Sequence, residues 1–175
     1  MISLRHDPPT DEQIIQWSLD NPGLRFEYVN GEITVSPTTG ISGIRRSALN
    51  LKLASWAKAH GYRSFGSSTL FHFGGLKVSP DEVLLLAARF DALSAEEQDE
   101  TVLLVPDVAV EIISKSQGFG KTRGGVLLKC QAMDGAGVGH VVMLDPSVTD
   151  PAERVITWGT PPPDFPNDWD DVLQP

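Results

Sequence analysis

The chain has 175 residues, a single cysteine (Cys130) and a formal net charge of −9 at pH 7. This length suits one domain with its own core, and one cysteine excludes an internal disulfide and a cysteine-based zinc site. The chain opens with MISLRHDPPTDEQ, which is charged and contains prolines, and its apolar runs are far too short to cross a bilayer. We therefore expect a cytoplasmic protein without a signal peptide or a membrane segment.

The charges are unevenly distributed along the chain. Residues 33–80 and 112–133 contain no acidic residue, yet they carry ten lysines and arginines, whereas the segment from Asp145 onward has seven acids against Arg154. A net charge of −9 argues against non-specific binding of nucleic acid over the whole surface. A local basic surface can still coexist with an acidic whole, and the alternative is an ordinary solvated helix face.

The first predicted elements are a short helix, a hairpin and a longer helix. Thr10 followed by Gln13 is a capping-box pattern, which predicts a helix that ends near Asp20. Residues 42–60 have apolar positions at helical spacing and are followed by Gly61, which predicts an amphipathic helix with a C-terminal glycine.

Between these helices, Asn30-Gly31 is flanked by two alternating runs, which is a strong signal for a two-residue hairpin turn. Such a turn pairs apolar residues on one face of the hairpin, namely Tyr28 with Ile33 and Phe26 with Val35. Glu27, Glu32 and Thr34 then project from the other face, which is either plain solvent surface or the wall of a site.

The second half of the chain alternates between strand and helix patterns. We expect strands within residues 62–73, 74–87, 105–114, 140–144 and 154–158, with a turn at Gly74-Gly75. We expect a short helix that starts at Ser94, because Glu97 completes a capping box, and another helix over residues 126–133. The order predicts an α/β protein with a mixed sheet: one domain over residues 1–160, then a Pro/Asp-rich tail over residues 161–175.

A glycine-rich loop, SQGFGKTRGG, follows the strand at 105–114 and suggests a phosphate-binding loop. Such a loop needs a glycine five residues before Gly120, and that position is Lys115. A P-loop-like nucleotide hydrolase is therefore the third hypothesis for function.

Glu111 lies within the apolar run VPDVAVEIIS, where a lone ionised carboxylate costs several kcal/mol unless it is paired. Asp107 is four residues away on the same strand, about 13 Å at the usual rise, which is too far to share a small metal ion with Glu111. Asp81 precedes a neighbouring strand that can lie about 4.8 Å away. Two interpretations remain open: Asp81 and Glu111 hold a metal ion, or Glu111 forms a salt bridge, with Lys129 as the obvious partner.

Six segments resemble, in order and spacing, the bacterial Uma-two family of restriction endonucleases, a branch of the PD-(D/E)XK nuclease superfamily. They are FEYVNGE, VSPTTGISGIRR, SSTLF, VSPDEVLLL, VPDVAVEIIS and K…AGVGHVVMLDP, and the likeness covers residues 10–158. The resemblance implies a restriction-endonuclease-like core, a mixed sheet flanked by helices, with an aspartate, a glutamate and a lysine around a divalent metal.

By motif position the resemblance makes Asp81 the aspartate, Glu111 the glutamate and Glu27 an auxiliary acid. The chain departs from the D…E-x-K pattern because Ile113 occupies the lysine position. In this family a lysine commonly lies on the following helix, sixteen residues before the Asp-Pro of the next strand, and here that residue is Lys129. Lys115 is the reserve candidate.

The implied activity is hydrolysis of nucleic acid, most simply DNA, with Mg²⁺ or Mn²⁺ held by Asp81, Glu111 and the Ile112 carbonyl. Lys129 would orient the attacking water or stabilise the transition state. Basic residues expected to contact nucleic acid are Arg45, Arg46, Lys115 and Lys121. We also expect a homodimer, as the resemblance implies. The alternative is a catalytically inactive binding or assembly module of the same fold, which the net acidity and Ile113 favour.

Overall fold

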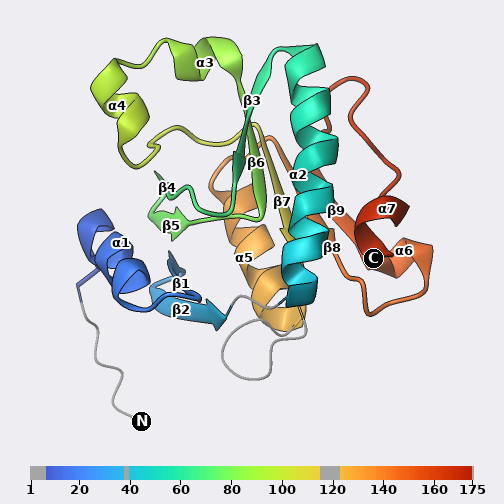
Figure 1. Ribbon diagram of the computed structural model, residues 1–175, viewed down its shortest axis with the longest axis horizontal. Helices are drawn as coiled ribbons and strands as arrows, with labels where there is room; N and C mark the ends of the chain where they lie inside the picture. The colour runs from blue at the N-terminus through green and yellow to red at the C-terminus, as the bar shows by residue number, and fades with distance from the viewer. Residues whose placement is uncertain (1–6, 38–39, 115–122, 175) are drawn as a thin grey trace.

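The computed structural model describes residues 7–37, 40–114 and 123–174, which form two β-sheets and seven helices (Figure 1). The four-stranded sheet has the order β2-β1-β5-β4 and consists of β1 (Leu24–Val29), β2 (Glu32–Pro37), β4 (Phe71–Phe73) and β5 (Leu76–Val78). The five-stranded sheet has the order β3-β6-β7-β8-β9 and consists of β3 (Tyr62–Gly66), β6 (Glu82–Leu86), β7 (Val108–Ile112), β8 (His140–Leu144) and β9 (Val155–Gly159). All strand pairs are antiparallel except β7 with β8, so the mixed α/β fold is confirmed.

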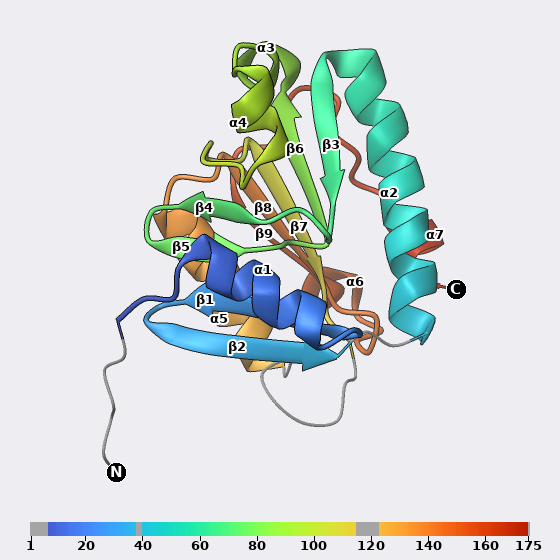
Figure 2. The ribbon, with the colours of Figure 1, turned by 60° about the vertical axis from the view of Figure 1, so that its left-hand side comes forward.

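Helices cover both faces of the five-stranded sheet, and the described residues form seven helices in all. They are α1 (Asp11–Asp20), α2 (Gly40–His60), α3 (Ala87–Asp91), α4 (Ala95–Asp99), α5 (Arg123–Gly135), α6 (Pro151–Arg154) and α7 (Asp170–Leu173). Helices α2 and α7 lie on one face of this sheet and α5 on the other, while α1 lies along the four-stranded sheet (Figures 1 and 2). No helix in the described ranges is long and apolar enough to cross a bilayer.

Strand β7 is buried on both faces, and its residues alternate between two separate cores. Val108, Val110 and Ile112 pack against α2 and α7, whereas Ala109 packs on the side of α5 and the four-stranded sheet. Because side chains in a strand alternate between the two faces of its sheet, Glu111 must also point toward α5. The uninterrupted apolar sequence around Glu111 is thus explained by burial on two sides.

Three local predictions from the sequence are confirmed by the structure. Thr10 and Gln13 cap each other's backbone, the hairpin pairs Tyr28 with Ile33 and Phe26 with Val35, and Gly61 follows α2 with φ of 76°. Two differences occur: the strand expected within residues 74–87 is two strands, β5 and β6, which belong to different sheets, and after Leu86 the chain turns into α3, a helix that we did not predict. Asp107 explains this turn, because its carboxylate accepts the Leu86 amide and binds Arg89.

The last described residues are part of the second core. Trp169, Val172 and Leu173 are buried against α2, and Lys52 of α2 forms an ion pair with Asp171. A tail rich in proline and aspartate is typical of a solvated segment, but here its few apolar side chains are spaced so that α7 buries them. Residues beyond 160 therefore contribute to the packing of the domain.

Candidate active site

Three side chains from distant parts of the chain meet between the two sheets. Lys129 of α5 places its Nζ atom 2.6 Å from Glu27 Oε1 of β1 and 2.5 Å from Glu111 Oε1 of β7. All three are almost completely buried. A short charge-assisted contact of this kind requires that each element hold its side chain in place.

Lys129 lies on the buried face of helix α5, and the other residues of that face are apolar. Val126, Lys129, Cys130 and Met133 are the buried residues of this helix, and their spacing places them on one side of it. Val126, Cys130 and Met133 fill the core beneath the four-stranded sheet. The lysine is therefore directed into the protein toward Glu111, and the sequence expectation of a helix-borne lysine near Glu111 agrees with this position.

Asp81 lies next to this cluster, immediately before β6. Its Oδ1 accepts from Arg46 Nε at 2.7 Å and from Arg25 Nη1 at 3.3 Å, and its Oδ2 accepts the Ile112 amide at 2.9 Å. Because β6 pairs with β7 through Glu82 and Val110, the preceding residue lies beside the Glu111 end of β7. Asp107, in contrast, binds Leu86 and Arg89 and takes no part in this cluster.

The buried charges in this region balance. The named contacts join three carboxylates, Glu27, Asp81 and Glu111, to three cations, Lys129, Arg25 and Arg46. Glu27 also accepts the Ser79 amide at 2.7 Å. Buried ions are tolerated when each is paired and hydrogen-bonded, so this network answers how the protein accommodates Glu111 in an apolar strand.

Electrostatics keep the cations of the network charged. Burial by itself would lower the pKa of Lys129, but the carboxylates of Glu111 and Glu27 outweigh it and raise the pKa above its ordinary value. Burial is likewise opposed at Arg25, where Asp81, Glu27 and Glu111 raise the pKa. Lys129 is therefore an ammonium ion at neutral pH, a point charge rather than a base.

Glu82 is a fourth buried carboxyl group in this region, and it lies on the α2 side. Its two oxygens accept from Asn50 Nδ2 at 3.3 and 3.2 Å. Burial raises the pKa of Glu82 to about 7, although hydrogen bonds from Ser64 and Asn50 oppose this shift. Sequence reasoning did not single out Glu82.

The donor set can be tested for the divalent metal that the family implies. The described residues contain no group of three or more His, Cys, Asp or Glu side chains close enough to hold a metal. Mg²⁺ does not need one, because it is usually bound by one or two carboxylates together with waters and substrate phosphates. Asp81 and Glu111 offer carboxylate oxygens on neighbouring segments, which is the ligand type of a hard ion such as Mg²⁺ or Mn²⁺. Ile112 lies beside Asp81, but the contact is made by its amide N–H, which donates to Asp81 Oδ2, and not by its carbonyl.

Of the four basic residues that we expected to contact nucleic acid, two lie in the described part of the chain. Arg46 faces inward and binds Asp81, and Arg45 has a buried Nε atom for which no hydrogen-bond partner occurs in the described part of the chain. Lys115 and Lys121 lie outside the described residues, as does most of the loop that suggested a phosphate-binding motif. Arg25 was missed from sequence, although its position two residues before Glu27 on one strand places both side chains on the same face.

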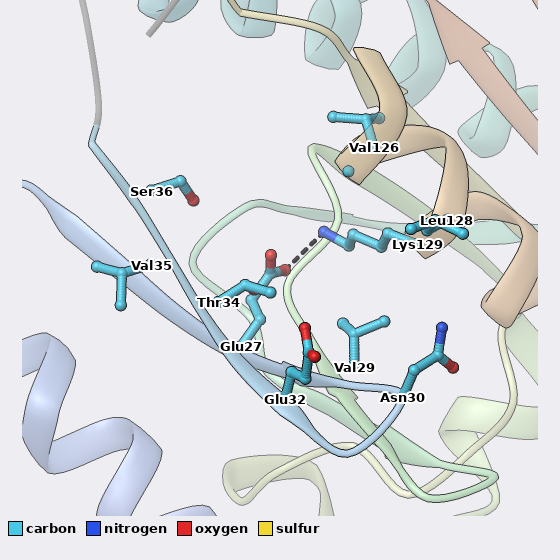
Figure 3. Close-up of a pocket in the computed structure, with 11 residues that line it drawn as sticks. Glu27, Val29, Asn30, Glu32, Thr34, Val35, Ser36, Val126, Leu128 and Lys129 are labelled. Carbon is cyan, nitrogen blue, oxygen red and sulfur yellow. Dashed lines mark hydrogen bonds and ion pairs between the residues drawn. The ribbon is translucent and has the colours of Figure 1, made fainter. Parts of the chain in front are cut away.

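A cavity of about 310 Å³ opens beside the cluster (Figure 3). It lies between the β1–β2 hairpin and α5, and Glu27 and Lys129 form part of its wall. Glu32 and Thr34, which the hairpin register placed on the same face as Glu27, line it as well. That face is therefore the wall of a cavity rather than plain solvent surface.

Comparisons with known proteins agree with this architecture. The model of the Uma2 family, described as "putative restriction endonuclease", matches residues 11–164. A crystal structure from Anabaena variabilis ATCC 29413, described as a putative nuclease belonging to DUF820, is similar with a TM-score of 0.66 and 19% identity, covering 91% of this chain and 97% of that chain. A search of curated proteins found no match.

Proposed function

Because the chain belongs to the Uma2 family, we propose that it hydrolyses phosphodiester bonds of nucleic acid with Mg²⁺ or Mn²⁺, held by Asp81 and Glu111. The observation that carries this proposal is the buried contact of Lys129 with Glu111 and Glu27, with Asp81 on the adjacent segment. An aspartate, a glutamate and a lysine thereby gather in one place.

The reaction sets the requirements for this site. A phosphodiester gains negative charge as water attacks, so the protein must supply positive charge there. A bound divalent ion supplies charge and lowers the pKa of a coordinated water. Lys129 contributes a fixed ammonium charge at the Glu111 end of the site, and Glu27 holds that ammonium in place from the other side.

The absence of a lysine at position 113 does not remove this charge. Ile113 is buried in the core on the α5 side of the sheet, the side that Glu111 also faces. Lys129 reaches Glu111 on that same side from α5. A lysine from the helix can therefore do what a lysine two residues after Glu111 does in the D…E-x-K pattern.

The alternative, an inactive binding module, has an observation in its favour. Asp81 already binds Arg25 and Arg46, and Glu111 already binds Lys129, so their charges are compensated without a metal. The alternative requires that nucleic acid stay uncleaved whichever divalent ion is present. It therefore differs from the proposal in a measurable way.

A cleavage assay with a matched control separates the two. Labelled DNA and RNA, single- and double-stranded, are incubated with wild type, Asp81→Asn and Asp91→Asn, each with Mg²⁺, Mn²⁺ or EDTA. Asp91 is a good control because it is an exposed aspartate paired with Arg63. We expect metal-dependent cleavage by wild type and Asp91→Asn and none by Asp81→Asn.

Calorimetric titration of the same proteins with Mg²⁺ should show binding to wild type and Asp91→Asn only. If wild type cleaves no nucleic acid with either ion and binds neither of them, the proposal is wrong and the binding module is favoured.

A further inference from the structure

The cavity beside Lys129 is lined by both apolar and polar residues, and the apolar ones lie on opposite sides of it. Val29 lies in the hairpin, and Val126 and Leu128 lie across the cavity on α5, which gives apolar surface on opposite sides (Figure 3). Its volume, about 310 Å³, lies at the small end of the range for pockets that enclose a small ligand, roughly 300–1,000 Å³. A flat apolar group can therefore be held between the hairpin and the helix.

Besides Glu27 and Lys129, polar groups of the cavity come from β2 and the hairpin turn. Glu32, Thr34 and Asn30 line it, and Figure 3 shows the Glu32 carboxylate on the same side of the hairpin as Glu27. A carboxylate only accepts hydrogen bonds, whereas hydroxyl and amide groups both donate and accept. The set suits a planar ligand whose edge carries an amino group.

The cavity adjoins the cluster of Glu27, Glu111 and Lys129. Lys129 and Glu27 belong to both, so a ligand in the cavity would contact side chains that also form the proposed catalytic site. Among the described residues that line the cavity, Lys129 is the only cation, and it is already bound to two carboxylates. A second phosphate is therefore a poor occupant, whereas an uncharged base is a good one.

We propose that the cavity binds one unpaired nucleobase of the substrate strand, next to the phosphate that is cut, and that it prefers a base with an exocyclic amino group. This inference rests on the proposed nuclease function and adds the substrate class: single-stranded nucleic acid, or a nucleotide extruded from a duplex. Enzymes that hold an unpaired base use apolar side chains against its faces and hydrogen bonds to its pairing edge. Glu32 accepts from the amino group of cytosine in the way that carboxylates do elsewhere.

Binding is tested without cleavage, by fluorescence anisotropy in EDTA and again with Mg²⁺. The probes are labelled oligonucleotides of about ten nucleotides: oligo(dC), oligo(dT) and a mixed-sequence duplex. Wild type should bind oligo(dC) about tenfold tighter than oligo(dT), which corresponds to roughly 1.4 kcal/mol. It should also bind single strands tighter than the duplex.

Three variants locate the effect. Leu128→Trp places a larger side chain in the wall and should weaken binding of oligo(dC) by about tenfold, and Glu32→Gln should remove the preference for dC over dT. Leu103→Trp is the control, because Leu103 is also exposed but is absent from the cavity wall, and it should bind like wild type.

The outcomes separate this inference from the proposed function. Metal-dependent cleavage of duplex DNA with no effect of Leu128→Trp or Glu32→Gln would overturn the nucleobase site and leave the nuclease standing. Neither binding nor cleavage of any nucleic acid by wild type would overturn both.

Discussion

At the scale of single residues, the site depends on a small set of compensated charges. Lys129 neutralises two carboxylates at once, so its removal leaves Glu27 and Glu111 buried near each other without their shared cation. Removing one partner of a buried ion pair is strongly destabilising, by about 3–5 kcal/mol, because the remaining charge is not solvated. The residue therefore has a structural and a proposed catalytic role, which must be measured separately.

Lys129→Met retains the apolar stem of the side chain and removes the ammonium group. We expect the free energy of unfolding in EDTA at neutral pH to fall by about 3–5 kcal/mol, measured by urea denaturation. We also expect cleavage to fall by several orders of magnitude, whereas Mg²⁺ affinity should not fall, because the ion no longer competes with the ammonium for Glu111. Unchanged stability would contradict the ion-pair network, and unchanged cleavage would contradict the catalytic role.

Glu82 gives the stability a dependence on pH that can be assigned to one carboxyl. Burial raises its pKa from 4.5 to about 7 in the folded protein, so the folded state binds a proton more tightly than the unfolded state. The resulting stabilisation is complete below about pH 4.5 and is lost as the pH rises to about 7. Glu82→Gln should therefore gain stability relative to wild type between about pH 5 and pH 8, as followed by thermal unfolding without divalent ions. Parallel curves would show that Glu82 is not responsible.

At the scale of elements, the sequence predicted what local chemistry determines. The capping boxes at Thr10 and Ser94 and the Asn30-Gly31 turn depend on neighbours within a few residues, so their patterns were sufficient. The neighbouring placement of Asp81 and Glu111 also followed from strand order. The arginine partners of Asp81 could not be predicted, because they arrive from β1 and α2 through packing over more than thirty residues.

Two glycines, one in the hairpin turn and one inside α2, allow a test of backbone conformation in which no side-chain contact changes. A methyl group added at Gly31 or at Gly43 would meet nothing within 4 Å, but Gly31 has φ of +84° in the hairpin turn, whereas Gly43 lies inside α2. Gly31→Ala should destabilise the protein by roughly 1–2 kcal/mol. Gly43→Ala should stabilise it by roughly 0.5–1 kcal/mol. Urea denaturation measures both, and equal effects would mean that the turn does not constrain the backbone.

At the scale of the whole molecule, two cores share one central sheet, and the Lys129–Glu27–Glu111 cluster lies on the side of one of them. The core on the α5 side contains Cys130 and Met133 beneath the cluster, whereas the core on the α2 side is closed by α7. The family match ends at residue 164, yet Trp169, Val172 and Leu173 beyond it are buried. The sequence predicted a Pro/Asp-rich tail over residues 161–175, because prolines and aspartates outnumber these three apolar residues there.

The C-terminal segment should therefore be required for stability and not for the chemistry. Trp169→Ala removes a large buried side chain and should lower the free energy of unfolding by about 3–5 kcal/mol, with exposure of the α2-side core detected by binding of a hydrophobic dye. Gln174→Ala is the control, because Gln174 is exposed and lies just after α7. At a temperature where Trp169→Ala is still folded, its rate of metal-dependent cleavage should equal that of wild type, because α7 packs against α2 on the face of the sheet opposite α5 and Lys129. Loss of cleavage in the folded variant would place α7 in contact with the functional site, and unchanged stability would mean that the segment is not part of the core.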